Sequence, residues 1–335
     1  MEGKRLGWVD LAKAMAFVAV VWGHTFPVGS RIRPIIYSFH MPFFFVIAGY
    51  TFSRKPMGRM AASSAKRLLL PYTLMYIAGS IPDLLIWTQS GRMGELIALA
   101  QSFVYVAGDN HDIPSVGATW FLVALFVARV VFNALLHIFE RRKLPLPAQG
   151  IACAAVAGAG HLIGGVLGIW LPLAADIGLV GCFFLWCGHA LRASGSMERA
   201  DKPVHILVSL GVWIAEISTG MPERVQAVSM LGRAYLFLPL AFAGAISASF
   251  LLMKACFVIE GLLSSAPGRA LFQRILSGGT YIGRSCMRLY LIHCLDFHFA
   301  WSAVSIPLLG STALTASLAR TTFDILVLLL FELIG

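Results

Sequence analysis

Residues 10–24 read DLAKAMAFVAVVWGH, an apolar run that contains a carboxylate, an ammonium group and an imidazole. The run extends over residues 8–27, about 20 residues, which as a helix crosses the roughly 30 Å hydrocarbon core of a bilayer. An ionisable side chain inside such a helix is costly, so it usually faces a protein interior or a water-filled cavity. The stretch therefore predicts a transmembrane helix with a functional polar face.

The composition extends this interpretation to the whole chain. Of the 335 residues, 58% are hydrophobic and only 13% are charged, whereas soluble domains have roughly 45–50% apolar and 25% charged residues. No linker, low-complexity tract or short-period repeat separates a second domain. We therefore expect one integral-membrane domain over residues 1–335.

Apolar runs of sufficient length recur along the chain and predict its fold class. The fold class is all-α, a polytopic bundle of about ten transmembrane helices, expected at residues 8–27, 35–53, 68–88, 116–139, 149–168, 170–192, 204–220, 234–255, 281–303 and 311–333. Residues 93–107 are too few to span, and the polar GDNHDIPS follows them, so we expect an interfacial or re-entrant loop there.

The basic residues predict the orientation of the bundle, because Lys and Arg near the ends of spans are retained on the cytoplasmic side. One side of the ten-span arrangement carries most of them. The other side carries only Arg31, Arg33, Arg92, Arg224 and Arg233. We therefore expect both termini in the cytoplasm, and the net charge of +10 reflects topology rather than nucleic-acid binding.

The polar residues of the first span share one helix face. His24 lies 11 positions after Lys13 and Asp10 lies one turn before it, so all three project to the same side at about 100° per residue. Lys13 and His24 are about 16 Å apart along the axis and serve different levels of one cavity, whereas Asp10 and Lys13 can pair. The alternative is that Lys13 reaches the interface and His24 caps the helix end.

The second span begins SFHMPFFFVIAGY and places His40 near the depth of His24. Neutral imidazole suits general base chemistry, because its ordinary pKa lies near neutrality. A metal site would need a third ligand, and no convincing one follows in the sequence. The six cysteines also lack metal or redox spacing, so we expect no metal.

Five segments, taken in order, carry a family resemblance: WVDLAKAMAFVAVVWGH, SFHMPFFFVIAGYTFSRK, AKRLLLPY, TWFLVALF and GRSCMRLYLIH. Together they resemble the integral-membrane acyltransferase 3 family, in particular its fucose 4-O-acetylase-like branch. The basic residue, ten intervening positions and histidine of that family fall on Lys13 and His24. The family often has Arg at the basic position, and Lys offers a point charge without bidentate geometry.

The resemblance implies a membrane O-acetyltransferase of the bacterial cytoplasmic (inner) membrane. Such an enzyme takes an acyl group, commonly acetyl, from cytoplasmic acyl-CoA and places it on a hydroxyl of a carbohydrate or lipid-linked glycan at the cell surface or for export. Acetyl-CoA is then the co-substrate, and membrane lipids surround the bundle. Neither the acceptor nor the oligomeric state follows from the sequence.

The phosphates of acyl-CoA need cationic partners on the cytoplasmic side. Arg67, next to Lys66, precedes the third span, while Arg284 and Arg288 are four residues apart and are expected on one face of the ninth helix. The alternative for all four is topology and lipid headgroup contact.

Further residues are assigned to the cavity or to the core. We expect Asp10, Trp120 and His293 to line the cavity or bind the acceptor, although Trp120 also fits an interfacial anchor. Polar pairing inside the bundle is the favoured interpretation for five others: Asp296 with His298, and Glu216, Asp324 and Arg320 as ion pairs.

The resulting hypothesis gives each catalytic residue a role. His24 removes the proton of the acceptor hydroxyl, His40 or a backbone amide stabilises the oxyanion, and Lys13 offsets negative charge. Two other classes remain open: a secondary transporter or glycan flippase that uses the same residues for a proton relay, and a membrane scaffold. Binding of coenzyme A discriminates between the three.

Overall fold

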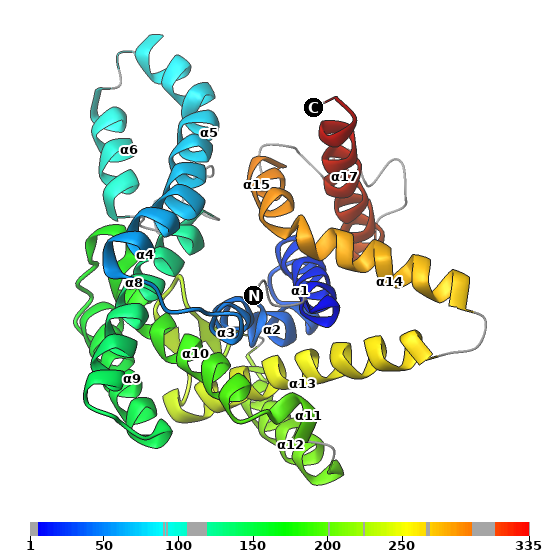
Figure 1. The fold of residues 1–335 in the computed structure, drawn as a ribbon. Coiled ribbons are helices and arrows are strands. Elements are labelled where there is room, and N and C mark those ends of the chain that lie inside the picture. The colour runs from blue at the N-terminus through cyan, green and yellow to red at the C-terminus, as the bar shows by residue number, and fades with distance from the viewer. Residues whose placement is uncertain are drawn as a thin grey trace. The chain divides into compact units, whose positions relative to one another are not determined.

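The computed structural model describes residues 6–89, 91, 93–105, 119–199, 202–223, 225–265, 269–296 and 312–334. These residues are almost entirely helical (Figure 1). Two compact units share the chain: unit 1 contains Met1–Ile47, Leu191–Val228 and Tyr235–Gly335, and unit 2 contains Ala48–Ala190 and Ser229–Ala234. The prediction of an all-α helical bundle is confirmed.

Unit 1 holds the N-terminal helices and the C-terminal third of the chain. Its elements are α1 (Gly7–Thr25), α2 (Ile32–Tyr37), α3 (His40–Tyr50, which continues into unit 2), α11 (Ser196–Arg199), α12 (Pro203–Gly220), α13 (Leu238–Ser265), α14 (Arg269–Arg284), α15 (Cys286–Asp296) and α17 (Ala313–Ile334).

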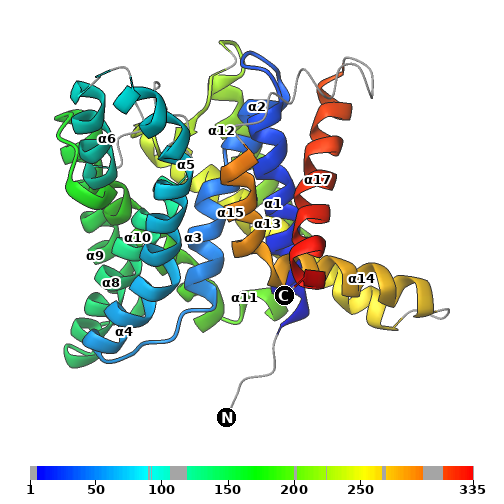
Figure 2. The same cartoon turned by 90° about the horizontal axis from the view of Figure 1, so that it is seen from above.

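The first helix is the centre of unit 1. Helix α1 contacts α13, α14, α15 and α17, and Figure 2 shows α15 and α17 running beside it. Its apolar side buries Phe17 and Val21 against Leu289 of α15 and Leu328 of α17. The helix ends at Thr25, two residues before Pro27, because proline cannot continue the helical hydrogen bonding. This packing brings the three helices together near the C-terminal end of α1.

The predicted ninth span, residues 281–303, is wrong as a single helix. Helix α14 ends at Arg284, the chain turns at Ser285, and α15 begins at Cys286. Just before the turn, Gly283 lies so close to α1 that a Cβ there would overlap the carbonyl oxygen of Asp10. In Figure 2, α14 runs across the direction of α1, α15 and α17. Residues 297–303 lie outside the described part of the chain.

Unit 2 holds the middle of the chain. Its elements are α4 (Met57–Ser64), a π-helical turn η1 (Ala65–Leu69), α5 (Leu70–Gln89), α6 (Met93–Tyr105), α8 (Trp120–Arg141), α9 (Leu146–His161), a π-helical turn η2 (Leu162–Val166), a 3₁₀ turn η3 (Pro172–Ala174) and α10 (Ala175–Ala193, which continues into unit 1). Two short strands, β1 (Val228–Ser229) and β2 (Ala234–Tyr235), form a two-stranded sheet.

The loop predicted for residues 93–107 is also wrong, because residues 93–105 form helix α6. This helix pairs with α5, where the hydroxyl of Tyr72 donates to the carbonyl oxygen of Phe103 at 2.7 Å and the hydroxyl of Tyr76 lies 2.7 Å from that of Ser102. Contacts of this kind stabilise a helix that its length alone would leave marginal. The polar GDNHDIPS segment that follows lies outside the described residues.

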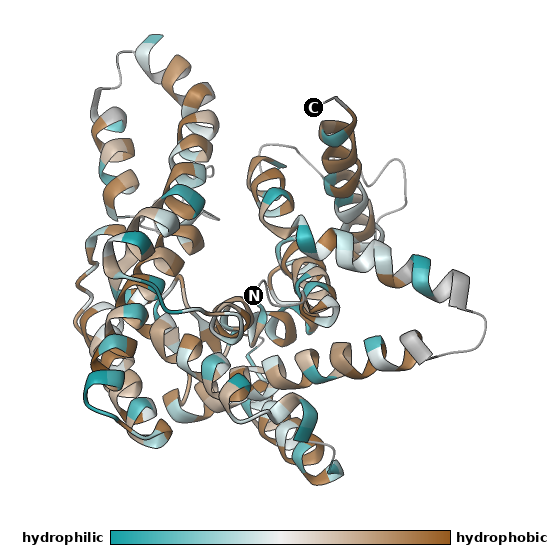
Figure 3. Cartoon of the chain, in the orientation of Figure 1, coloured by the Kyte–Doolittle hydropathy of each residue, from teal (hydrophilic) through white to brown (hydrophobic). Residues whose placement is uncertain are grey.

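Seven helical segments among the described residues are long and apolar enough to cross a membrane. They are Ile32–Tyr50, Trp120–Arg141, Leu146–Val166, Pro172–Ala193, Pro203–Gly220, Leu238–Leu263 and Ala313–Leu333. Three predicted spans account for the difference from ten: residues 8–27, whose polar side chains lower the hydropathy, residues 68–88, and residues 281–303. Figure 3 shows the contrast between the apolar α17 and the mixed α14. The number ten and the orientation of the termini stay predictions.

Candidate functional site

The predicted base, His24, contacts a second histidine. Its Nδ1 lies 3.1 Å from Nε2 of His293, and the two rings stack with centroids 5.3 Å apart and planes inclined by 12°. His24 is half-buried in the last turn of α1, and His293 on α15 is fully buried. The contact joins residues 269 positions apart in the chain, so their sequence spacing gave no sign of it.

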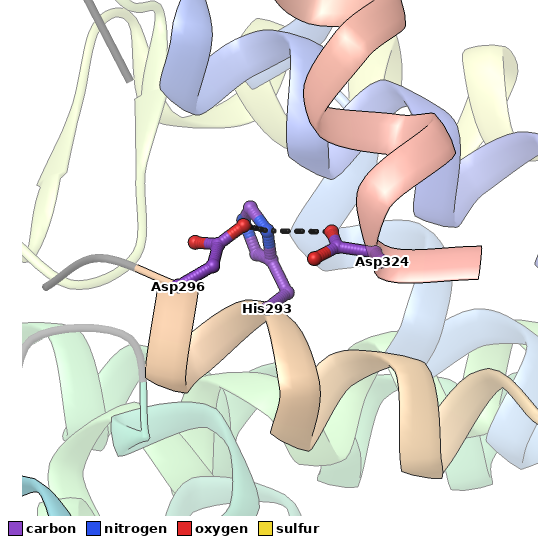
Figure 4. Close-up of side chains that lie close together, drawn as sticks. All are labelled: His293, Asp296 and Asp324. Carbon is purple, nitrogen blue, oxygen red and sulfur yellow. Dashed lines mark hydrogen bonds and ion pairs between the residues drawn. The ribbon is translucent and has the colours of Figure 1, made fainter. Parts of the chain in front are cut away.

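Two carboxylates hold the other side of the His293 ring. Its Nδ1 lies 3.1 Å from Oδ2 of Asp296 and 3.2 Å from Oδ2 of Asp324. Figure 4 shows His293 and Asp296 on α15 and Asp324 opposite them on α17. All three side chains are buried. Because an ionised carboxylate only accepts hydrogen bonds, Nδ1 of His293 is the donor.

A buried arginine closes this group. Nε of Arg320 donates to Oδ2 of Asp296 at 2.8 Å, and its second nitrogen donates to Oδ1 of the same carboxylate. Arg320 also lies 3.5 Å from the hydroxyl of Thr25, next to His24. We call these residues the histidine–carboxylate network: His24, His293, Asp296, Arg320 and Asp324. The network contains two carboxylates and one guanidinium.

The atoms of His293, Asp296 and Asp324 that could ligate a metal ion lie within 4.8 Å of one another, which is close enough to share one ion. The surroundings disfavour an ion, because Arg320 occupies both oxygens of Asp296. A divalent cation there would lie against a fixed guanidinium, and like charges at that distance repel. We therefore interpret the group as an ion-pair network rather than as a metal centre.

His40 contacts two residues of the neighbouring helix α2, Ile36 and Tyr37. Its Nδ1 donates to the carbonyl oxygen of Ile36 at 3.0 Å, and its ring packs against Tyr37 with centroids 4.6 Å apart. Tyr37 in turn lies 6.2 Å from the ring of His24. With Nδ1 protonated, the neutral ring has its lone pair on Nε2, so His40 donates to an oxyanion only when it is protonated.

Near the start of α1, one carboxylate serves two cations. Asp10 is buried, and its carboxylate lies 3.5 Å from Nζ of Lys13 and 3.7 Å from Nε of Arg284. The predicted local pairing of Asp10 with Lys13 is confirmed. Both cations remain partly exposed, with side-chain exposures of 28% for Lys13 and 56% for Arg284.

The predicted stacking of Arg284 and Arg288 on one helix face is wrong, because the turn at Ser285 separates them onto α14 and α15. The two arginines also have different partners. Arg288 lies 2.5 Å from a carboxylate oxygen of Glu332 on α17 and donates to the hydroxyl of Ser285 at 3.0 Å. Tyr281 donates to the same Glu332.

Arg67 and Trp120, the other two predicted site residues, belong to unit 2. Arg67 is exposed in η1, and Trp120 is buried at the start of α8 with its ring nearly perpendicular to that of Phe121. Arg129 in the middle of α8 was not among the predicted site residues, and it is near enough to Arg67 for the two charges to interact. A cation inside an apolar span was the signal that could have found it.

The predicted bundle ion pairs are confirmed in part. Arg320 pairs with Asp296, and Asp324 joins the network through His293. Glu216 is different: it is buried against Gly244, and among the described residues neither of its carboxylate oxygens has a hydrogen-bond partner. Among the described residues, Glu216 therefore does not form the predicted ion pair. His298, the predicted partner of Asp296, lies outside the described residues.

Unit 2 contains a buried ion pair that the sequence analysis did not predict. Nε of Arg233 lies 2.5 Å from Oδ2 of Asp176, and the guanidinium covers the ring of Trp170 at 4.5 Å. The backbone N–H of Leu171 donates to the other carboxylate oxygen at 3.3 Å. Arg233 was counted only among the five basic residues on the side opposite the cytoplasm, and that charge pattern does not predict its burial.

Comparison with known families identifies the chain. The family model of the acyltransferase domain Acyl_transf_3 matches residues 6–331, which include every residue of the histidine–carboxylate network. No curated protein and no solved structure matches the chain. The family model does not distinguish the fucose 4-O-acetylase-like branch. Taken with the apolar helices, the match shows that the chain belongs to the acyltransferase 3 family and is an integral membrane acyltransferase.

Proposed function

We propose that the chain is an O-acetyltransferase that moves an acetyl group from cytoplasmic acetyl-CoA to a hydroxyl of a carbohydrate or lipid-linked glycan, as in the fucose 4-O-acetylase-like branch. The observation that carries this proposal is the placement of His24. It is a half-buried imidazole held by a fully buried histidine inside a family member whose chemistry is acyl transfer.

His24 is the general base of the proposed reaction. It removes the proton from the acceptor hydroxyl while the oxygen attacks the thioester carbonyl, and coenzyme A leaves as the thiolate. A base positioned within hydrogen-bond reach typically contributes about 10²–10⁴-fold to such a step. His40, when protonated, or a backbone amide stabilises the oxyanion.

The acyl donor, acetyl-CoA, is proposed to bind near the N-terminal end of α1, away from His24. Lys13, Arg284 and Arg288 are partly exposed cations on three helices of unit 1, and phosphates bind preferentially to such groups. Arg67 of unit 2 is a further candidate for the nucleotide phosphates. Asp10 and His293 are proposed to line the cavity in unit 1, His293 through its contact with His24, and Trp120 is a separate candidate in unit 2.

The test is binding and turnover of radiolabelled acetyl-CoA by the protein in detergent, with free fucose and with water as acceptors. We expect the double variant Arg284→Gln/Arg288→Gln to lose acetyl-CoA binding. The variant His24→Gln should keep binding and lose transfer by about 100-fold or more.

The matched control for the arginine variants is Arg274→Gln, an exposed arginine elsewhere on α14, which should bind acetyl-CoA normally. If the folded wild-type protein does not bind acetyl-CoA at all, the proposal fails and a transporter or flippase becomes the leading alternative.

A further inference from the structure

We propose that His293, held by Asp296 and Asp324, is a positioning residue that fixes the tautomer of His24 and shares the proton that His24 removes. The inference rests on the proposed function, because it explains how His24 becomes a base. It assigns roles to Asp296, Arg320 and Asp324, which the sequence analysis treated as bundle ion pairs.

The tautomer follows from the order of contacts. The carboxylates only accept, so Nδ1 of His293 carries a hydrogen. A neutral His293 therefore has its lone pair on Nε2, which faces Nδ1 of His24 at 3.1 Å. That lone pair accepts the Nδ1 hydrogen of His24. The lone pair of His24 is then on Nε2, and this is the atom that acts as the base towards the acceptor hydroxyl in the proposed reaction.

The charge balance explains why the network can accept a proton. Asp296 and Asp324 together exceed the single guanidinium of Arg320 by one negative charge, and all three are buried. Buried charge of one sign is costly unless it is compensated. One proton taken up by the two histidines makes the five-residue network neutral.

The charged and titratable groups around His24 come from four other helices. They are Arg33 on α2 and His40 on α3, which act on it electrostatically, and His293 and Asp296 on α15 with Arg320 and Asp324 on α17. The carboxylates of this set lie behind His293 rather than beside His24. Their negative charge therefore acts on His24 through the ring of His293.

The proposed step balances as follows. The acceptor O–H bond breaks, its proton bonds to Nε2 of His24, and the oxygen bonds to the acyl carbon. The Nδ1 hydrogen of His24 moves towards Nε2 of His293, whose own Nδ1 hydrogen stays between Asp296 and Asp324. The C–S bond then breaks, and the proton returns through His24 to the departing thiolate. The products are the ester and free coenzyme A.

The first test reads the tautomer directly and does not depend on activity. Histidine labelled with ¹⁵N is incorporated into the protein in detergent, and the His24 and His293 signals are assigned by their loss in His24→Gln and His293→Gln. We expect His24 to show a protonated Nδ1 and an unprotonated Nε2. The opposite pattern, with the hydrogen on Nε2 of His24, would overturn the inference.

The second test measures the transfer step. In Asp324→Asn we expect the single-turnover rate of acetyl transfer to fall by about 100-fold, while the dissociation constant of acetyl-CoA changes by less than about twofold. The matched control is Glu216→Gln, which replaces another buried carboxyl group of unit 1 that the mechanism does not use. Equal rates for Asp324→Asn and the wild type would overturn the inference, as would one bound divalent ion per chain in the purified protein.

The two proposals fail separately. If the wild-type protein shows the expected tautomer and yet does not bind acetyl-CoA, the proposed function fails while the network stands. If the wild type binds and transfers acetyl groups while the tautomer is reversed, the proposed function stands and the role of His293 is wrong.

Discussion

The two units of the chain each bury acidic and basic side chains, and they differ in charge balance. In unit 2, one carboxylate meets one guanidinium in the pair of Asp176 and Arg233. In unit 1, two carboxylates hold His293 between them, and one of the two, Asp296, pairs with Arg320. A neutral ion pair gains no electrostatic stabilisation from an added proton. The network in unit 1 has one extra negative charge and therefore does gain it, and this network contacts His24. Excess charge, rather than burial alone, marks the residues suited to chemistry.

The largest expected effect comes from unbalancing the pair in unit 2. Removal of one partner of a buried ion pair leaves an uncompensated charge, so Arg233→Met should lower the free energy of unfolding by about 3–5 kcal/mol. The measurement is thermal unfolding in detergent. The double variant Asp176→Leu/Arg233→Met removes both charges and should recover most of the loss. Equal destabilisation by the single and double variants would contradict a role for charge balance.

Another buried carboxylate, Asp10 of unit 1, pairs with Lys13 and Arg284, and its backbone carbonyl lies against Gly283 of α14. In Gly283→Ala the new methyl group would overlap the Asp10 carbonyl, so we expect a loss of about 1–3 kcal/mol in unfolding free energy. Gly278→Ala, on the same helix with open space around it, should instead gain about 0.5–1 kcal/mol from helix propensity. The two variants are compared by their unfolding midpoints, and equal midpoints would show that α14 does not approach α1 this closely.

Neutralising the excess carboxylate of unit 1 should raise the free energy of unfolding, whereas Arg233→Met in unit 2 should lower it. Asp324→Asn removes the unbalanced charge, so we expect the free energy of unfolding to rise by about 0.5–2 kcal/mol, a gain typical of relieved functional sites. The same variant should transfer acetyl groups more slowly. A variant that is both less stable and fully active would contradict the comparison on both counts.

The smallest effect is expected at an exposed ion pair. Arg54 and Glu140 of unit 2 pair at the surface, with side-chain exposures of 39% and 63%. Exposed pairs contribute about 0.2–1 kcal/mol, so Arg54→Met and Glu140→Gln should each shift the unfolding midpoint only slightly. A loss as large as that in Arg233→Met would show that exposure does not separate the two kinds of pair.

The features that depend on local sequence were predictable. Helical class, most of the spans and the polar face of the first helix follow from apolar run length and helical periodicity, and the pairing of Asp10 with Lys13 follows from a spacing of three residues. Each of these properties is set by residues within a single helical segment.

The features that depend on contacts between distant segments were not predictable. Spacing placed His40 near His24 but did not predict the contact of His24 with His293, which the packing of α15 against α1 brings about. The break at Ser285 was missed because residues 281–303 are apolar without interruption by proline. Just before the break, Gly283 approaches α1 closely, and this contact between two helices is not visible in the sequence of either segment alone.

The sharing of Asp10 by Lys13 and Arg284 has a consequence for the electric field along α1. One carboxylate and two cations leave a net positive charge near Asp10, whereas the network at the other end is net negative. The 14 residues from Asp10 to His24 span about 21 Å as a helix. The group around Asp10 therefore favours an anion, and the histidine–carboxylate network favours a proton. An anionic nucleotide is stabilised at one end and a transferred proton at the other, without movement of either helix end.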